Sequence, residues 1–118
     1  MNAAVTSLSR AADGRASRRT LSRLLGFALI LTLCLVMLGA WVRLTDAGLG
    51  CPDWPGCYGH LTPDHAGEKI AQAVQQQGGE HGPVSLGKAW REMIHRYIAT
   101  FLGLVILVIA AVAFRRRQ

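Results

Sequence analysis

The fold of this chain is decided by residues 24–42, LLGFALILTLCLVMLGAWV, which include no charged side chain. At about 1.5 Å of rise per residue, a helix of this length approaches the ~30 Å hydrocarbon core of a bilayer. A second apolar run, YIATFLGLVILVIAAVAF, covers residues 97–114, and the preceding KAWREMIHR can extend its helix to the interface. Neither run has the polar stripe of a soluble amphipathic helix. The sequence therefore predicts an all-α integral membrane protein whose two transmembrane helices form an antiparallel hairpin.

The charges indicate how this hairpin is oriented. The formal net charge is +6, and the excess lies in residues 1–23 and 115–117, whereas residues 43–96 carry five basic and six acidic side chains. Because cytoplasmic flanks collect Lys and Arg, both termini are expected in the cytoplasm and the connecting segment in the periplasm. This places the chain in the inner (plasma) membrane. A water-soluble nucleic-acid-binding protein is excluded, since the excess charge flanks the apolar runs.

A cleaved signal peptide is the alternative for the first apolar run, because SRRTLSR at residues 17–23 is similar to a twin-arginine export signal. The apolar run is longer than the roughly 7 to 15 residues of a signal peptide, so an uncleaved anchor is favoured. The expected segments are a basic cytoplasmic tail, the first transmembrane helix, an outer loop, the second transmembrane helix and a basic end. Their bounds are 1–23, 24–42, 43–85, 86–114 and 115–118.

The outer segment is rich in loops and is expected to contain one short amphipathic helix. Residues 43–62 are dense in Gly and Pro, which interrupt regular structure. Thr62 before Pro63 is typical of a helix start, and apolar residues then recur on one face, so a helix is expected over residues 63–76. Ser85 is expected to cap the second transmembrane helix.

Cys51 and Cys57 lie in this outer segment, where an oxidising compartment favours a disulfide. Such a bond can staple the loop, or it can be redox-active, and the residues leave both roles open. Cys34 lies in the middle of the first span, where it is expected to act only as a small apolar residue.

Glu92 and His95 are three residues apart and therefore share a helix face at the outer end of the second span. A neutral His95 could bind a metal or haem iron while Glu92 handles protons or orients a partner. In the alternative, these side chains, together with Arg91 and Arg96, are simply solvated at the interface. Arg43, at the outer end of the first span, could pair with an acid or a porphyrin propionate, or could extend into water.

The segments LGAWVRLTDAGLGCPDWPGCYG at residues 38–59 and WREMIHRYIATFLGL at residues 90–104 resemble the start of haem A synthases of the cytochrome oxidase assembly family. In that family an RLT-x-x-GLG segment ends the first transmembrane helix. A cysteine pair follows in the first outer loop, and an E-x-x-H-R motif begins the second helix. All three features occur here in the same order.

The resemblance implies a role for each of these residues. His95 is similar to a histidine that binds haem iron, in haem b or haem O, and Glu92 to an acidic residue of the oxidation. Cys51 and Cys57 are similar to the family's disulfide pair. Members oxidise a methyl group of haem O to a formyl group and so make haem A for cytochrome oxidase, with haem O synthase as the expected donor.

The family's enzymes have more transmembrane helices than this chain, and histidines from different helices hold each haem. The resemblance therefore implies an N-terminal portion of a larger helical bundle, inactive alone, that works with the missing helices, a split partner or a second copy of itself. Two alternatives do not need haem. One is a membrane-anchored thiol/disulfide module, and the other is a non-catalytic assembly subunit whose small residues pack against other helices.

Overall fold

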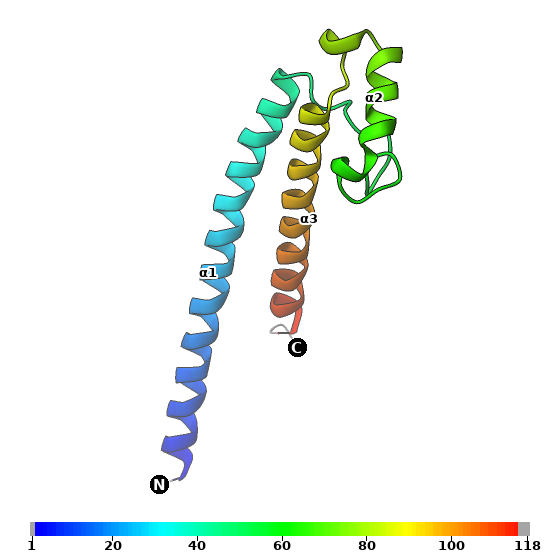
Figure 1. The fold of residues 1–118 in the computed structure, drawn as a ribbon. Helices are drawn as coiled ribbons and strands as arrows, with labels where there is room; N and C mark the ends of the chain where they lie inside the picture. Colours follow the sequence, from blue (N-terminus) through cyan, green and yellow to red (C-terminus); the bar gives the residue numbers. More distant parts are fainter. Residues whose placement is uncertain (1, 116–118) are drawn as a thin grey trace. The chain divides into compact units, whose positions relative to one another are not determined.

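The computed structural model describes residues 2–115, with side chains described from residue 14 onward except at residue 80. The described chain consists of helices and loops, with no strand between residues 2 and 115, which confirms the all-α prediction (Figure 1). The elements in order are α1 (Asn2–Leu44), the 3-10 helix η1 (Pro63–Ala66), α2 (Gly67–Gln76), the 3-10 helix η2 (Gly79–His81) and α3 (Leu86–Arg115).

Two helical stretches, Gly14–Leu44 and Leu86–Arg115, are long and apolar enough to cross a membrane. Only 11% and 6% of their most apolar windows are buried, so most of their apolar surface is left for lipid or for other helices. Helix α1 begins well before the apolar run because residues 2–23 are rich in Ala and Arg, which favour helix.

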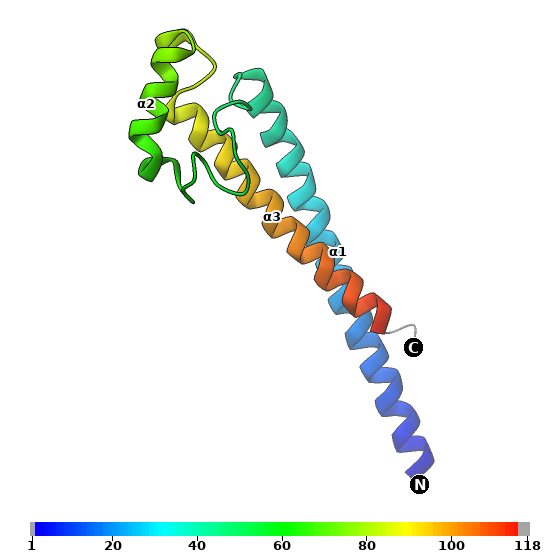
Figure 2. The ribbon, with the colours of Figure 1, turned by 90° about the vertical axis from the view of Figure 1, so that its right-hand side faces the viewer.

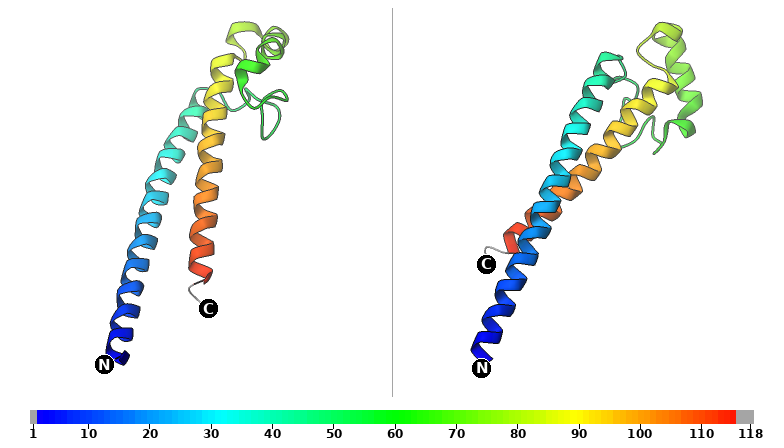
Figure 3. Two further views of the ribbon diagram at one scale, coloured as in Figure 1. Left: turned by 60° about the horizontal axis from the view of Figure 1, so that its bottom comes forward. Right: turned by 90° about the vertical axis from the view of Figure 1, so that its left-hand side faces the viewer.

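The chain divides into two compact units, which are described separately. One comprises Leu33–Phe101, where the end of α1 and the beginning of α3 run in opposite directions (Figures 2 and 3). The intervening segment returns along the first turns of α3 in this unit. The other unit comprises residues 1–32 and 102–118, and its described buried apolar residues are Ala28 and Leu102.

A small apolar core lies within the Leu33–Phe101 unit, between α2, the outer loop and the first turns of α3. It is formed by Cys51, Cys57, Ala66, Ile70, Ala73, Val84, Ala89 and Met93. Helix α2 contributes Ile70 and Ala73, which confirms the amphipathic pattern expected from its sequence. Met93 is fully buried, so α3 is fixed to this core one residue after Glu92.

The two helix starts expected from the sequence have different caps. The Ser85 hydroxyl accepts a hydrogen bond from the backbone N–H of Lys88 at 3.2 Å, as expected for an N-cap. Thr62 precedes η1 in an extended conformation but makes no side-chain capping bond. Its hydroxyl instead lies 2.6 Å from Nδ1 of His65, so Thr62 occupies the N-cap position but its hydroxyl does not cap the helix.

Candidate functional site

The beginning of α3 brings Glu92 against the outer loop. Its side chain is buried, with 7% of the residue surface exposed. Oε2 accepts a hydrogen bond from the backbone N–H of Cys51 at 3.0 Å, and Oε1 forms an ion pair with Arg96 one turn further along the helix. The alternative in which Glu92 is solvated at the interface is therefore wrong.

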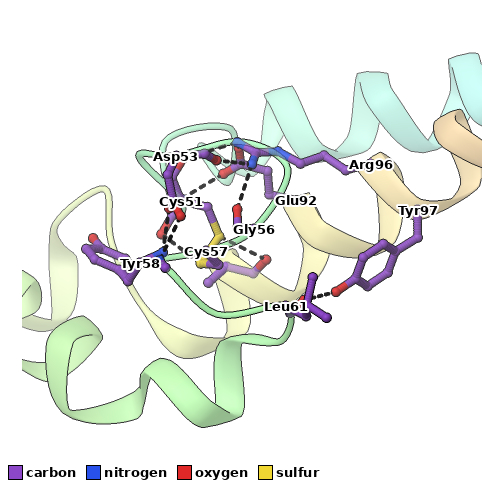
Figure 4. Close-up of a disulfide and its surroundings, with 12 residues drawn as sticks. Cys51, Asp53, Gly56, Cys57, Tyr58, Leu61, Glu92, Arg96 and Tyr97 are labelled. Carbon is purple, nitrogen blue, oxygen red and sulfur yellow. Dashed lines mark hydrogen bonds and ion pairs between the residues drawn. A yellow bond between two sulfur atoms is a disulfide. The ribbon is translucent and has the colours of Figure 1, made fainter.

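Arg96 connects α3 to three carbonyl groups of the cysteine loop, as Figure 4 shows. Nη1 donates to the carbonyl oxygens of Asp53 and Gly56, the latter at 3.0 Å. Nη2 donates to the carbonyl oxygen of Cys51 at 3.1 Å as well as to Glu92. The guanidinium is thus surrounded by one carboxylate and three backbone dipoles, and it too is bonded to protein groups rather than left to solvent.

The loop itself is closed by a bond between the sulfur atoms of Cys51 and Cys57, which are 5% and 0% exposed. Inside the loop, the carboxylate of Asp53 accepts hydrogen bonds from the backbone N–H groups of Tyr58 and, at 2.7 Å, of Gly59. Both residues have positive φ, 53° and 83°, and they turn the chain back on itself. Asp53 therefore stabilises the turn that follows the disulfide.

The electrostatics of this loop favour a charged Asp53 and a neutral Tyr58. Burial alone would raise the pKa of Asp53, but hydrogen bonds from the N–H groups of Gly59 and Tyr58, with the positive charge of Arg96, lower it below its ordinary 3.8. The pKa of Tyr58 is raised by burial, then by the negative charges of Asp53 and Glu92. The loop consequently contains an ionised carboxylate and a protonated phenol at neutral pH.

His95 lies one turn after Glu92, half-buried, and its ring approaches α1 at Gly39. A Cβ atom at Gly39 would lie 2.7 Å from Nε2 of His95, so only a glycine leaves room for the ring as it stands. Among the residues that the structure describes, none forms a hydrogen bond with this imidazole. Its Nε2 atom thus lies against Gly39 of α1.

Arg43 lies apart from the contacts that join Glu92 to the cysteines. It is exposed and lines a hollow of about 680 Å³ that also includes Gly39, Leu49 and Lys88. The structure therefore brings Glu92, Cys51 and Cys57 into one bonded cluster, and it places His95 against Gly39 and Arg43 beside the same glycine. Among the side chains that the structure describes, no group of three or more His, Cys, Asp or Glu residues is arranged to hold a metal ion.

Sequence reasoning missed Arg96 and Asp53 as parts of this site. A signal was present for Arg96, because Glu and Arg four residues apart on a helix commonly pair. Another was present for Asp53, since Asp residues in loops often accept hydrogen bonds from nearby N–H groups. The three loop carbonyls that Arg96 contacts carry no signal of their own in the sequence.

The sequence profile of the cytochrome oxidase assembly protein family matches residues 22–118. The chain belongs to this family. The match includes the first apolar run, the cysteine loop and α3, so the whole bonded cluster of Glu92, Arg96 and the two cysteines lies within the family region.

Curated relatives of this chain include several proteins named haem A synthase. One from Shewanella oneidensis is 49% identical over 89 residues, which is 75% of this chain and 26% of the relative. Others from Rhizobium etli and Rhizobium leguminosarum are 34% and 30% identical, covering 75% and 83% of this chain and 27% and 29% of the relatives. The chain thus spans about a quarter of the length of these relatives. No solved structure matches it.

Proposed function

We propose that this chain forms the part of a haem A synthase in which His95 would bind haem iron and α3 holds the cysteine loop nearby. The complete enzyme would oxidise a methyl group of haem O to the formyl group of haem A, passing the electrons to an acceptor. The observation that carries the proposal is the position of His95, an unbonded imidazole beside Gly39 in a chain of this family. The comparisons do not favour a separate thiol module or a non-catalytic subunit.

His95 has the properties that haem ligation needs. Its ring is half-buried, and its nitrogens make no hydrogen bond with the described side chains or backbone. A neutral imidazole nitrogen is a common axial ligand of haem iron, and the bound iron would supply the redox chemistry. We propose haem b or haem O as the group bound. A second residue that binds the iron would come from further helices of the same enzyme, a split partner or a second copy of this chain.

We assign Glu92 to proton handling in the oxidation. Its two oxygens accept one backbone N–H and one arginine contact, while an ionised carboxylate can accept about four hydrogen bonds. Acceptor capacity for a substrate hydroxyl or a water therefore remains. Arg43, which lines the hollow beside Gly39, is assigned to a haem propionate, since guanidinium groups pair well with carboxylates.

The same proposal includes the membrane topology of the chain, the source of its substrate and the state of its two cysteines. Residues 1–23 and 115–118 would lie in the cytoplasm, residues 24–42 and 86–114 would span the inner membrane, and residues 43–85 would lie in the periplasm. The basic flanks of the two spans support this orientation. Haem O synthase is the proposed source of the substrate, and the oxidising compartment would favour the bond between Cys51 and Cys57.

The test is a His95→Ala variant, examined by absorption spectroscopy of the membrane-embedded protein before and after dithionite reduction. The chain is measured alone and after co-expression with the remaining helices of the Shewanella oneidensis relative. We expect sharp reduced haem bands with the native sequence and a loss of most of that signal in the variant. His65→Ala is the matched control, because His65 is exposed and its ring is hydrogen-bonded to Thr62 rather than placed beside Gly39. Equal haem content in His95→Ala and His65→Ala would refute the ligand assignment.

A further inference from the structure

Arg96 contacts the cysteine loop at several points, although it lies outside the loop on α3. Its terminal nitrogens Nη1 and Nη2 carry four N–H groups, and the structure gives four acceptors for them. Nη1 donates to the carbonyl oxygens of Asp53 and Gly56, and Nη2 to the carbonyl oxygen of Cys51 and to Glu92. The two terminal nitrogens therefore donate all of their hydrogen bonds within one cluster.

The acceptors are spread over the ring that the disulfide closes. The carbonyls belong to the first, third and sixth residues of the seven from Cys51 to Cys57. Both backbone polar groups of Cys51 are hydrogen-bonded to α3, because its N–H donates to Glu92 while its carbonyl accepts from Arg96. Two side chains of α3, one turn apart, thus fix the backbone on which the disulfide is built.

From this geometry we infer that Arg96 is a positioning residue that holds residues 51–57 in the conformation closed by the disulfide. The argument rests on hydrogen bonds of the loop and does not depend on haem binding. When the backbone of residues 51–57 is held in this form, the two sulfur atoms stay close even after the bond between them is opened. Arg96 therefore favours the disulfide over the two free thiols.

Lysine cannot replace arginine in this role. An ammonium group offers three N–H donors from a single point, whereas the guanidinium is a rigid planar fork that reaches separated acceptors. Arg96→Lys keeps the charge beside Glu92 but would remove most of the hydrogen bonds to the loop. Arg96→Gln removes both the charge and the fork, so the two variants separate the charge from the geometry.

The test measures the thiol–disulfide equilibrium of the full chain in detergent micelles against a graded series of dithiothreitol concentrations. Free thiols are counted by a gel shift with a maleimide-polyethylene glycol, in a Cys34→Ala background that removes the free cysteine of the described chain. We expect Arg96→Gln to lower the dithiothreitol needed for half-reduction at least tenfold, and Arg96→Lys to lie between it and the native chain. Arg91→Gln is the matched control on the same helix, because Arg91 lies over the ring of Trp41 and not on the loop.

A second measurement separates positioning from general loss of folding. Hydrogen–deuterium exchange of the oxidised Arg96→Lys chain should rise in residues 51–60 and stay unchanged in α2. The inference is overturned if the Arg96 variants are reduced at the same dithiothreitol concentration as Arg91→Gln. It is equally overturned if exchange in α2 rises as much as exchange in the loop, because the disulfide would then respond to unfolding of the whole unit.

Discussion

Replacing Gly50 with alanine would drive a methyl group into the backbone of α3. A Cβ atom at Gly50 would lie 2.8 Å from the backbone nitrogen of Ala89 and 2.9 Å from its Cα, distances that real Cβ atoms do not tolerate. The obstructing atoms belong to a helix backbone, so no side chain can rotate away. Either the loop or the helix has to move.

The expected cost follows from the size of this overlap. Inserting one methyl group into a well-packed site typically costs about 1 to 3 kcal/mol. At about 1.4 kcal/mol per factor of ten, that raises the equilibrium constant for local opening of the loop roughly 5- to 150-fold. Because Cys51 follows directly, its hydrogen bond to Glu92 should be among the first to break.

The assay is hydrogen–deuterium exchange of the oxidised chain in detergent micelles, followed by mass spectrometry of peptides that cover residues 51–60. Gly48→Ala is the matched control, because no atom lies within 4 Å of a Cβ at that position. We expect faster exchange only in Gly50→Ala. Equal exchange in the two variants would refute the close approach of Gly50 to α3.

Three further predictions concern His95, Asp53 and the core. Gly39→Ala should push the ring of His95 away from α1, because its Cβ would lie 2.7 Å from Nε2, and the reduced haem spectrum of the co-expressed enzyme should weaken or shift. Asp53 has a lowered pKa, so its contribution to loop stability should be complete above pH 3.8 and lost as the pH falls through the lower, folded-state value. Acid titration followed by near-ultraviolet circular dichroism checks this. Met93→Ala should reduce the free energy of unfolding by about 2 to 5 kcal/mol in a denaturant titration, because Met93 is fully buried.

Each of these predictions has a control within the chain. Gly26→Ala should leave the haem spectrum unchanged, since nothing lies within 4 Å of a Cβ there. Asp53→Asn should abolish the acid transition assigned to Asp53, and a transition that persists would assign it to another group. Ile94→Ala should cost much less than Met93→Ala, because Ile94 is 43% exposed, and equal costs would contradict the described core.

Most of the fold could be predicted because it depends on local patterns. The uncharged runs at 24–42 and 97–114 are sufficient for two long helices, and apolar residues spaced along 66–74 are sufficient for α2. The extension of α1 back to Asn2 was not anticipated, because helix propensity in the basic tail is a weaker signal than an apolar run.

Only part of the site could be predicted, because some of its residues carry a local signal in the sequence whereas others meet through long-range contacts. Glu92 could be singled out because an ionisable group at a membrane edge needs an explanation. Its contact with the N–H of Cys51 could not be foreseen, because it joins residues 41 positions apart through the conformation of a glycine-rich loop. The same loop ends in the left-handed backbone of Tyr58, which nothing in a tyrosine indicates.

The double attachment of Cys51 to α3 also bears on how such proteins can be recombined. Its N–H and its carbonyl are bonded to the side chains of Glu92 and Arg96, respectively. The loop and the first turns of α3 should therefore be exchanged together, as one segment. A chimaera that takes residues 51–57 from a relative but keeps a foreign α3 would bring donors and acceptors from different parents together. Crossover points placed before Gly50 and after Tyr97 would keep the partners from a single parent and transfer the loop intact.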